Sequence, residues 1–161
     1  MVTLRPARPE DREHLLAVYA STRAEELAPV PWTAEQKAAF VRMQFDAQTT
    51  YWGEQYPDAE RSVIEIDGAP VGRLYVQRWP QEIRLVDIAL LPDFRGRGAG
   101  TELIQRLLSE ATLTGRAVTI HVEILNPARA LYERNGFAPK GEQGMYMLME
   151  WRLAVAAESF S

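Results

Sequence analysis

The chain has 161 residues, of which 47% are hydrophobic and 25% are charged, and its formal net charge at pH 7 is −4. This length and composition predict one globular domain, residues 1–161, that buries a sizeable core. The acidic balance and the lack of long runs of like charge argue against nucleic acid or an anionic membrane as a partner. The sequence contains no cysteine, which excludes disulfides, thiolate catalysis and thiolate metal sites.

The N-terminal sequence MVTLRPARPEDREHL is charged almost from its start. No apolar run in the chain approaches the roughly 18 residues that a membrane-spanning helix requires. We therefore expect a cytoplasmic protein.

The N-terminal third predicts a strand followed by two helices. VTLRPA is typical of a short strand, and residues 9–27 have apolar positions at helical spacing behind an acidic first turn. Thr33 and Gln36 form a capping box for the second helix. We assign the apolar face of this helix to Phe40, Met43 and Ala47, and expect it to end in an aromatic loop, TTYWGEQYPDAE.

The middle of the chain predicts three strands and an amphipathic helix. Residues 61–79 contain two strands around Asp67-Gly68, a hairpin signal, and residues 80–92 contain a third. The helix that follows has a single apolar stripe and ends at LTG. The stripe consists of Leu103, Ile104, Leu107, Leu108 and Ala111.

The C-terminal part predicts a strand over RAVTIHVEI, a short helix closed by Gly136, and a final strand over GMYMLMEWRL. A further short strand is expected near Ala138. Period-two alternation places Thr119, His121 and Glu123 on one face of the first of these strands and its apolar residues on the other.

The resulting order is β-α-α-β-β-β-α-β-α-β. It predicts an α/β (α+β) fold with a mixed, mostly antiparallel sheet of six to seven strands and four helices. The strand-helix-strand crossover makes the two strands on either side of the glycine-rich helix a parallel pair. The ligand crevice is expected at the carboxyl end of the strand that enters this helix.

The junction LLPDFRGRGAGTELIQRLLSEA places Gly96, Gly98 and Gly100 between that strand and its helix. A helix N-terminus offers unpaired N–H groups and partial positive charge, and glycine lets a phosphate approach them. Arg95 and Arg97 add charge. The pattern favours a phosphate site over a merely flexible turn.

Two familiar phosphate motifs do not fit this junction. A P-loop requires Lys-Ser/Thr after the final glycine, and a dinucleotide fingerprint requires Gly or Ala at the position that Thr101 occupies.

The segment Arg95-Gly96-Arg97-Gly98-Ala99-Gly100 resembles the Arg/Gln-x-x-Gly-x-Gly/Ala motif of the GNAT (GCN5-related) N-acetyltransferase family. ARALYERNGF resembles that family's A-x-x-L-Y-x-x-x-G-F ending, and the order of strands and helices over nearly the whole chain is also similar. The resemblance implies the GNAT fold, with the parallel pair of strands splayed apart.

The resemblance further implies that acetyl-CoA is the cosubstrate. Its pyrophosphate would be cradled by the segment Arg95 to Thr101, and its pantetheine arm would pair with the backbone of Ile88, Ala89 and Leu90. The Leu90 N–H would stabilise the oxyanion of the tetrahedral intermediate. The acceptor amine would attack directly, so no side-chain nucleophile is needed.

Tyr132 matches the tyrosine that in much of the family faces the coenzyme A sulfur, which makes it the candidate general acid. The alternative is a core tyrosine beside Ala128 and Leu131. Asn126 would be another coenzyme contact, although it precedes Tyr132 by six residues where seven is common.

Glu123 and Asp87 are the candidates for the general base, and water is a third. Glu123 lies near the carboxyl end of its strand, whereas Asp87 lies among apolar residues that could raise its pKa. Their alternative roles are a solvated strand end and a structural acceptor. His14 and His121 are too few for a metal site and are interpreted as satisfied surface or core histidines, so no metal is expected.

The resemblance places the acceptor pocket around the first two helices and the last strands. Aromatic faces suit an ammonium group, although such residues also pack on cores. The candidates are Trp32, Tyr51, Trp52, Tyr56, Trp79 and Tyr146.

These observations favour an enzyme that acetylates a primary amine of a small molecule or a protein. A coenzyme-binding sensor without catalysis and a transferase of a bulkier acyl group are the alternatives. The resemblance also suggests a homodimer.

Overall fold

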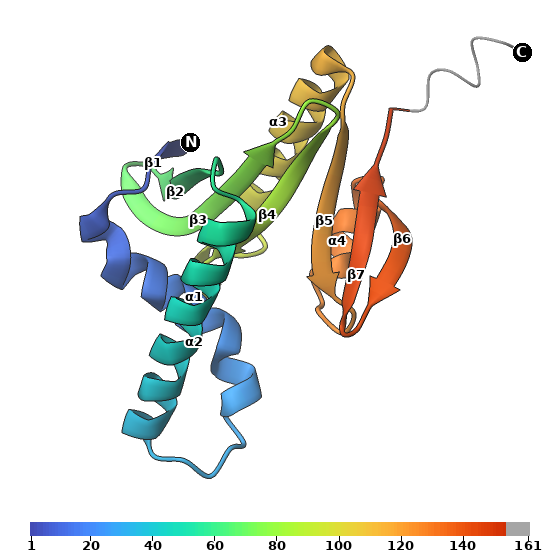
Figure 1. Ribbon diagram of the computed structural model, residues 1–161. Helices are drawn as coiled ribbons and strands as arrows, with labels where there is room; N and C mark the ends of the chain where they lie inside the picture. The colour runs from blue at the N-terminus through green and yellow to red at the C-terminus, as the bar shows by residue number, and fades with distance from the viewer. Residues whose placement is uncertain (154–161) are drawn as a thin grey trace, which may run out of the picture. The chain divides into compact units, whose positions relative to one another are not determined.

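The computed structural model describes residues 1–153 and contains four α-helices and seven strands in the predicted order (Figure 1). The elements are β1 (Val2–Pro6), α1 (Arg12–Leu27), α2 (Ala34–Gln55), β2 (Glu60–Ile66), β3 (Ala69–Arg78), β4 (Glu82–Leu90), α3 (Ala99–Thr114), β5 (Ala117–Glu123), α4 (Arg129–Arg134), β6 (Ala138–Gln143) and β7 (Tyr146–Trp151). Two 3-10 turns, η1 (Pro9–Asp11) and η2 (Pro92–Phe94), precede α1 and α3.

The strands form one sheet in the order β1-β2-β3-β4-β5-β7-β6. β4 and β5 pair in parallel, whereas β1 with β2, β5 with β7 and β6 with β7 pair antiparallel. The predicted mixed sheet with one parallel pair is therefore confirmed, and β6 is the short strand expected near Ala138. No helix in residues 1–153 combines the length and apolar character needed to cross a membrane.

The described chain divides into two compact units. The first comprises Met1–Tyr75 and Ile88–Arg97, and the second comprises Val76–Asp87 and the chain from Gly98 onward. Each unit is described by itself.

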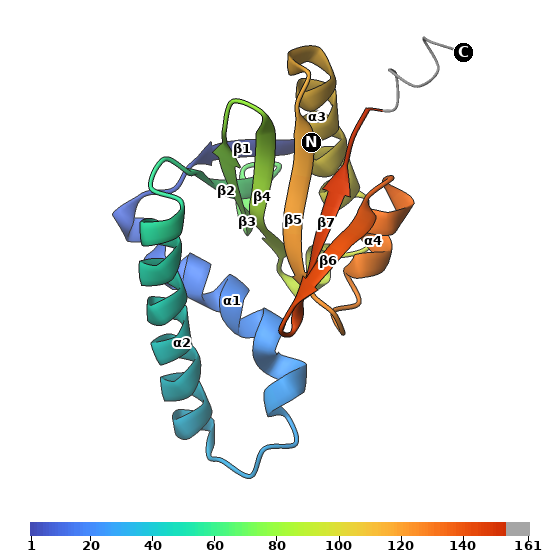
Figure 2. The same cartoon turned by 45° about the vertical axis from the view of Figure 1, so that its right-hand side comes forward.

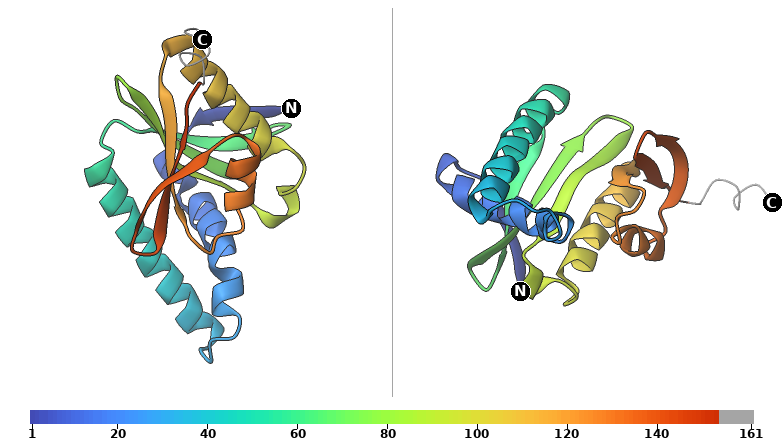
Figure 3. Two further views of the ribbon diagram at one scale, coloured as in Figure 1. Left: turned by 90° about the vertical axis from the view of Figure 1, so that its right-hand side faces the viewer. Right: turned by 90° about the horizontal axis from the view of Figure 1, so that it is seen from below.

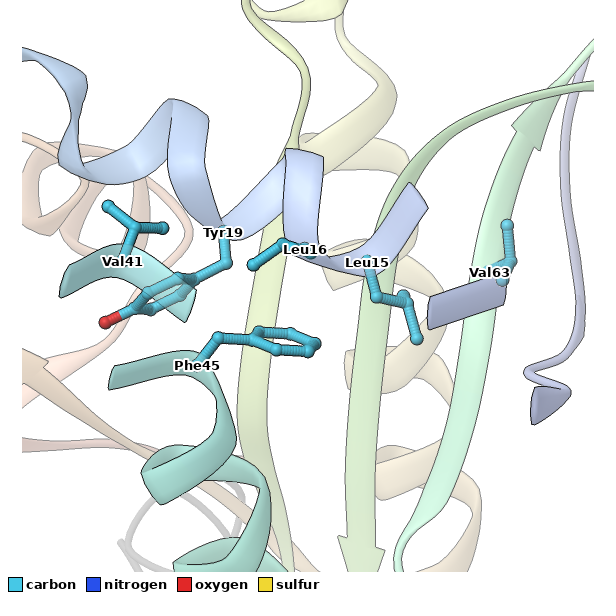
Figure 4. Close-up of a cluster of buried hydrophobic side chains, with 6 residues drawn as sticks. All are labelled: Leu15, Leu16, Tyr19, Val41, Phe45 and Val63. Atoms are coloured by element: carbon cyan, nitrogen blue, oxygen red, sulfur yellow. The ribbon is translucent and has the colours of Figure 1, made fainter. Parts of the chain in front are cut away.

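The core of the first unit joins α1, α2 and β2. Leu15, Leu16 and Tyr19 of α1 are buried with side chains from the other two elements (Figure 4). From α2 these are Val41 and Phe45, and from β2 Val63. The Tyr19 and Phe45 rings lie 5.9 Å apart between centroids.

The predicted apolar face of α2 is wrong, because Met43 and Ala47 are exposed. Val41 and Phe45 are buried, whereas Met43 is 61% exposed. Apolar residues occur on both sides of this helix, so periodicity alone does not distinguish the two faces. Phe40 instead packs against Trp32, with the ring centroids 5.3 Å apart.

The expected aromatic loop after α2 is also wrong, because the helix continues to Gln55. The capping box at its start is confirmed: Gln36 N donates to Thr33 Oγ1, and Thr33 N donates to Gln36 Oε1. The helix passes through the Thr49-Thr50 pair, and Thr49 Oγ1 donates to the Phe45 carbonyl one turn earlier, a bond that a helix accommodates.

Polar contacts tie β1 to the start of α1 and to β2. Arg5 donates two hydrogen bonds to the Asp11 carboxylate, at 2.8 and 2.9 Å, and one to Glu65 at 3.0 Å. The hydrogen bonds from Arg5 and from the Arg8 N–H hold the pKa of Asp11 well below its usual range. At the β2–β3 hairpin Asp67 and Gly68 both have positive φ, as the predicted turn requires.

The second unit is built on β5, β7 and β6, which run side by side (Figure 2). The buried residues of α3 are the predicted stripe together with Ala99. Helices α3 and α4 lie next to each other (Figure 3), and the Cβ position of Gly100 is 3.8 Å from Leu131 Cδ2. The parallel ladder runs from Glu82–Ala117 to Leu85–Ile120, and β5 continues beyond it to Glu123.

Candidate active site

The segment between η2 and α3 has the backbone that its glycines predict. Gly96 and Gly98 have φ values of 73° and 88°, and Gly98 is the N-cap residue of α3. A Cβ atom at either position would meet nothing within 4 Å. Glycine is therefore required here by backbone conformation and not by crowding.

Gly100 differs from its two neighbours because it already lies in α3. A Cβ at this position would make only an ordinary contact, at 3.8 Å, with Leu131 Cδ2. The first intrahelical bond runs from Glu102 N to Gly98 O, so the N–H groups of Ala99 and Thr101, like that of Gly100, precede it. The fold does not need glycine at this position, where it leaves the positive end of the helix uncovered.

Arg95 connects this loop to the end of β4 within the first unit. Its Nε donates to the Leu90 carbonyl at 2.9 Å, and its Nη2 donates to Ser21 Oγ at 3.2 Å. The Arg97 guanidinium lies over the Phe94 ring, 5.5 Å from the centroid. Arg95 therefore has a structural role in addition to its charge.

The segment predicted to pair with pantetheine, Ile88 to Leu90, lies against a glycine that its motif does not include, Gly72. A Cβ at Gly72 would lie 2.3 Å from the Ala89 carbonyl oxygen and 3.2 Å from Leu90 Cα. Leu91 N also donates to the Val71 carbonyl at 2.8 Å. An isolated glycine inside a strand pattern is the signal that could have indicated this close backbone approach.

We expect Gly72→Ala to destabilise the protein by about 2 kcal/mol, because a backbone carbonyl cannot rotate away from the new methyl group. The melting temperature should fall by about 4–8 °C, and binding of acetyl-CoA should weaken as Ala89 and Leu90 are displaced. Thermal unfolding and calorimetry measure the two effects. The matched control is Gly53→Ala in α2, where nothing lies within 4 Å and alanine should slightly raise stability. An unchanged melting temperature of Gly72→Ala would contradict the expectation.

Tyr132 lies in α4 and is 4% exposed. Its ring packs edge-on against Phe137, with the centroids 5.8 Å apart. Burial, and to a smaller extent the charge of Asp87, raise the pKa of the Tyr132 hydroxyl above its ordinary value. Its hydroxyl therefore keeps its proton throughout the neutral range, as a hydrogen-bond donor must.

Asn126 lies in the exposed connection between β5 and α4. Its Oδ1 accepts a hydrogen bond from Ala128 N at 2.9 Å, and its N–H donates to the Glu123 carbonyl. The side chain thus shapes the turn into α4. A role in coenzyme binding stays a prediction.

The two candidate bases occupy opposite faces of the second unit's strands. Asp87 lies on the same face of β4 as the buried Ile83 and Leu85, and its charge raises the pKa of Tyr132. Glu123 lies on the same face of β5 as Thr119, which is the face opposite to that of Asp87. The Thr119 side chain contacts Arg84 on this face. Both carboxylates belong to half-buried residues.

Residues 19–137 match the family model described as acetyltransferase (GNAT) family. The chain belongs to the GNAT family.

Two curated relatives and a solved structure are similar to this GNAT protein. An uncharacterized N-acetyltransferase of Methanocaldococcus jannaschii is 36% identical over 48% of this chain and 38% of its own length. A Bacillus subtilis protein, named for a suggested ribosomal protein bS18-alanine N-acetyltransferase activity, is 25% identical over 89% of this chain and 85% of its own. The chain therefore spans well under half of the first relative and most of the second.

The solved structure is the PaiA N-acetyltransferase of Thermoplasma acidophilum in complex with coenzyme A. It is 17% identical, covers 95% of this chain and 99% of its own, and superposes with a TM-score of 0.72. At this identity the likeness establishes the fold.

Four of the predicted acceptor aromatics of this GNAT protein belong to the first unit. Trp32 and Tyr51 are 43% and 57% exposed, and Tyr56 is the C-cap residue of α2. Trp52 lies in α2 with its ring 5.7 Å from that of Tyr75.

Arg73 of β3 is 2% exposed, and its guanidinium contacts three aromatic rings, one of which is that of Trp52. Its guanidinium carbon lies 5.2 Å from the Trp52 centroid, 5.4 Å from that of Tyr75 and 5.7 Å from that of Tyr19. Its Nη2 donates to Gln48 Oε1 at 3.1 Å. A charged residue at an inward strand position was the sequence signal for this cluster. One face of Trp52 is thus covered by a cation of the protein itself.

Trp79 and Tyr146 belong to the second unit. The Arg84 guanidinium covers Trp79 at 5.2 Å from the ring centroid. Tyr146 is 47% exposed and pairs with Glu123 across the β5–β7 ladder. The structure thus brings Tyr146 beside one of the candidate bases.

The first unit also has a cavity of about 440 Å³ between α1 and α2. Its lining is mainly alanine, leucine and valine, with Glu13, Lys37 and Arg42 among it, and does not include the predicted aromatics. Within residues 1–153 no group of three or more His, Asp or Glu side chains is placed to hold a metal ion.

Proposed function

We propose that this GNAT protein transfers the acetyl group of acetyl-CoA to a primary amine of a small molecule or a protein. The observation that carries the proposal is Gly100, a glycine that neither φ nor packing requires, at the bare N-terminus of α3. A site of this kind binds phosphate. The coenzyme A complex of the PaiA relative supports the pyrophosphate of that coenzyme as its ligand.

The coenzyme would be bound by the segment Arg95 to Thr101 through backbone N–H groups and arginine charge. Ile88, Ala89 and Leu90 would pair with its pantetheine arm, and Gly72 supports their backbone position. The Leu90 N–H would donate to the thioester oxygen as it becomes an oxyanion.

In the proposed reaction the neutral amine attacks the thioester carbonyl carbon. A C–N bond forms, the C–S bond breaks, the amine loses a proton to a base, and the thiolate gains one from an acid. The products are the amide and free coenzyme A. No side chain of the protein becomes acetylated.

Glu123 is a better candidate for the general base than Asp87. Asp87 instead acts on Tyr132, the proposed acid. Glu123 lies on the face of β5 that carries Thr119 and His121, whereas Asp87 acts electrostatically on Tyr132. Direct transfer needs a base at the amine nitrogen and an acid at the leaving sulfur, which are two different substituents of the tetrahedral carbon.

Tyr132 is proposed as the donor to the leaving sulfur. Because its pKa is raised, it is a weaker acid than a coenzyme A thiol, so full transfer of its proton is uphill. A hydrogen bond from its hydroxyl to the developing thiolate is favourable in any case. We therefore assign Tyr132 to stabilising the leaving group, with proton transfer completing the step.

The test is thiol release from acetyl-CoA in the presence of small amines and N-terminal peptides, together with calorimetric binding of acetyl-CoA. Micromolar binding and amine-dependent thiol release are expected. Binding that persists with no turnover for any amine would favour the coenzyme-binding sensor, and absent binding would contradict the proposal as a whole.

A further inference from the structure

A polar cluster lies on the face of the second unit's sheet that carries Thr119 and His121. Arg84 is at its centre, and its side chain is 12% exposed. Its Nε donates to Thr119 Oγ1 at 2.8 Å, and Thr119 Oγ1 in turn donates to Glu82 Oε2 at 2.5 Å. Trp79 covers the guanidinium. These contacts hold the Arg84 side chain in one orientation.

Arg84 also determines which nitrogen of His121 carries a proton. Arg84 Nη1 lies 3.3 Å from His121 Nδ1. A guanidinium only donates, so a hydrogen bond between these two atoms makes Nδ1 the acceptor, and the neutral imidazole then carries its proton on Nε2. Burial and the charge of Arg84 lower the pKa of His121, against a smaller opposing effect of Glu82. His121 is therefore a hydrogen-bond donor and not a base, because its lone pair is engaged.

His121 occupies a distinctive place in β5. It is the first residue beyond the parallel ladder with β4, which ends at Ile120, and it is exposed. It pairs with Leu148 of β7, as Glu123 pairs with Tyr146. The two side chains share one face and are two residues apart, which is roughly 7 Å along a strand.

We infer that His121 is a specificity-determining residue whose Nε2–H binds an oxygen atom of the acceptor while Glu123 receives the amine. This inference rests on the proposed function. The acceptor class is then an amine that carries a carbonyl or carboxylate oxygen roughly 5–7 Å from its nitrogen. Arg84 is a positioning residue in this arrangement, because it acts through His121.

The first measurement is the tautomer of His121. The sequence has two histidines, so a long-range ¹⁵N–¹H spectrum at pH 7 contains two imidazoles, and His121→Gln assigns them. We expect the His121 imidazole to carry its proton on Nε2 and to have an unprotonated Nδ1. A proton on Nδ1 would overturn the inference.

The second measurement is binding of matched amines to the complex with coenzyme A. The probes are 3-aminopropionate, 4-aminobutyrate and 5-aminopentanoate, with 4-aminobutanamide as the neutral carbonyl and butylamine as the probe without oxygen. At least one oxygen-bearing probe should shift the His121 Nε2 resonance and bind roughly 10- to 100-fold more tightly than butylamine. Equal affinity and equal shifts for all the probes would overturn the inference whether or not any of them is acetylated.

Variants separate the donor from mere packing. His121→Gln retains an N–H donor and should keep the preference for oxygen within about threefold, whereas His121→Leu should abolish it by raising KM for the oxygen-bearing probe alone. His14→Gln, which alters the other histidine, should leave the preference unchanged. Retained preference in His121→Leu would show that another group binds the oxygen. Failure of the proposed function is distinct: it would appear as no thiol release with any amine while the spectrum and the binding series remain readable.

Discussion

Replacement of Tyr132 by Phe is expected to lower kcat by roughly 10²- to 10⁴-fold while KM for acetyl-CoA changes little. The variant removes one hydroxyl and keeps the ring that packs against Phe137. If the hydroxyl donates to the departing sulfur, its loss affects the transition state and not the binding of the coenzyme. Steady-state thiol release at saturating amine measures the effect.

The pH profile adds a second readout for Tyr132. Burial and Asp87 raise its pKa, so the donor form persists beyond the ordinary tyrosine value of about 10. Ionisation of this residue therefore should not reduce activity below that pH. Because the pKa of Tyr132 is higher in the folded state, its contribution to the free energy of unfolding is complete below the unfolded-state pKa. That contribution declines as the pH rises above this value.

Tyr19→Phe is the matched control for Tyr132. Tyr19 is also buried, at 3% exposure, and its hydroxyl bonds Gln44 and Arg23. This control should lose some stability and keep kcat within a few fold. A Tyr132→Phe enzyme with nearly normal kcat would show that Tyr132 is a core residue.

Replacement of Gly100 by Glu is expected to abolish measurable acetyl-CoA binding while the fold is retained or becomes slightly more stable. A carboxylate in the first turn of α3 interacts favourably with the helix dipole, and glycine is the poorest ordinary residue within a helix. The same carboxylate faces the proposed pyrophosphate site, where like charge costs several kcal/mol, or roughly 10² or more in affinity. The acetyl-CoA affinity measured by calorimetry should therefore fall, while the melting temperature stays the same or rises slightly.

Two variants control for Gly100→Glu. Gly100→Ala adds only the methyl group that meets Leu131 at an ordinary distance, and it should weaken binding modestly. Ser109→Glu adds the same charge to an exposed position of α3 far from its first turn, and should leave binding unchanged. Normal acetyl-CoA affinity in Gly100→Glu would contradict the phosphate site and, with it, the proposed function.

Local patterns were sufficient for most of the secondary structure. The Thr33 and Gln36 capping box, the Asp67-Gly68 turn and the apolar stripe of α3 each depend on neighbours within a few residues, and all three are confirmed. The two errors concern α2. Its length and its buried face depend on what α1 presents to it, and periodicity does not contain that information.

The candidate site shows the same division. The sequence by itself determined the family, through the glycine segment and the Leu-Tyr ending, because these are contiguous motifs whose chemistry belongs to the local backbone. The same glycine segment predicts the place of the phosphate loop. Only the tertiary structure decided that Gly72 must be glycine, that the charge of Asp87 acts on Tyr132, and that Arg84 lies beside His121 Nδ1. Each of these depends on atoms of strands or helices that are far apart in the chain, and their separation in space is set by packing and strand register.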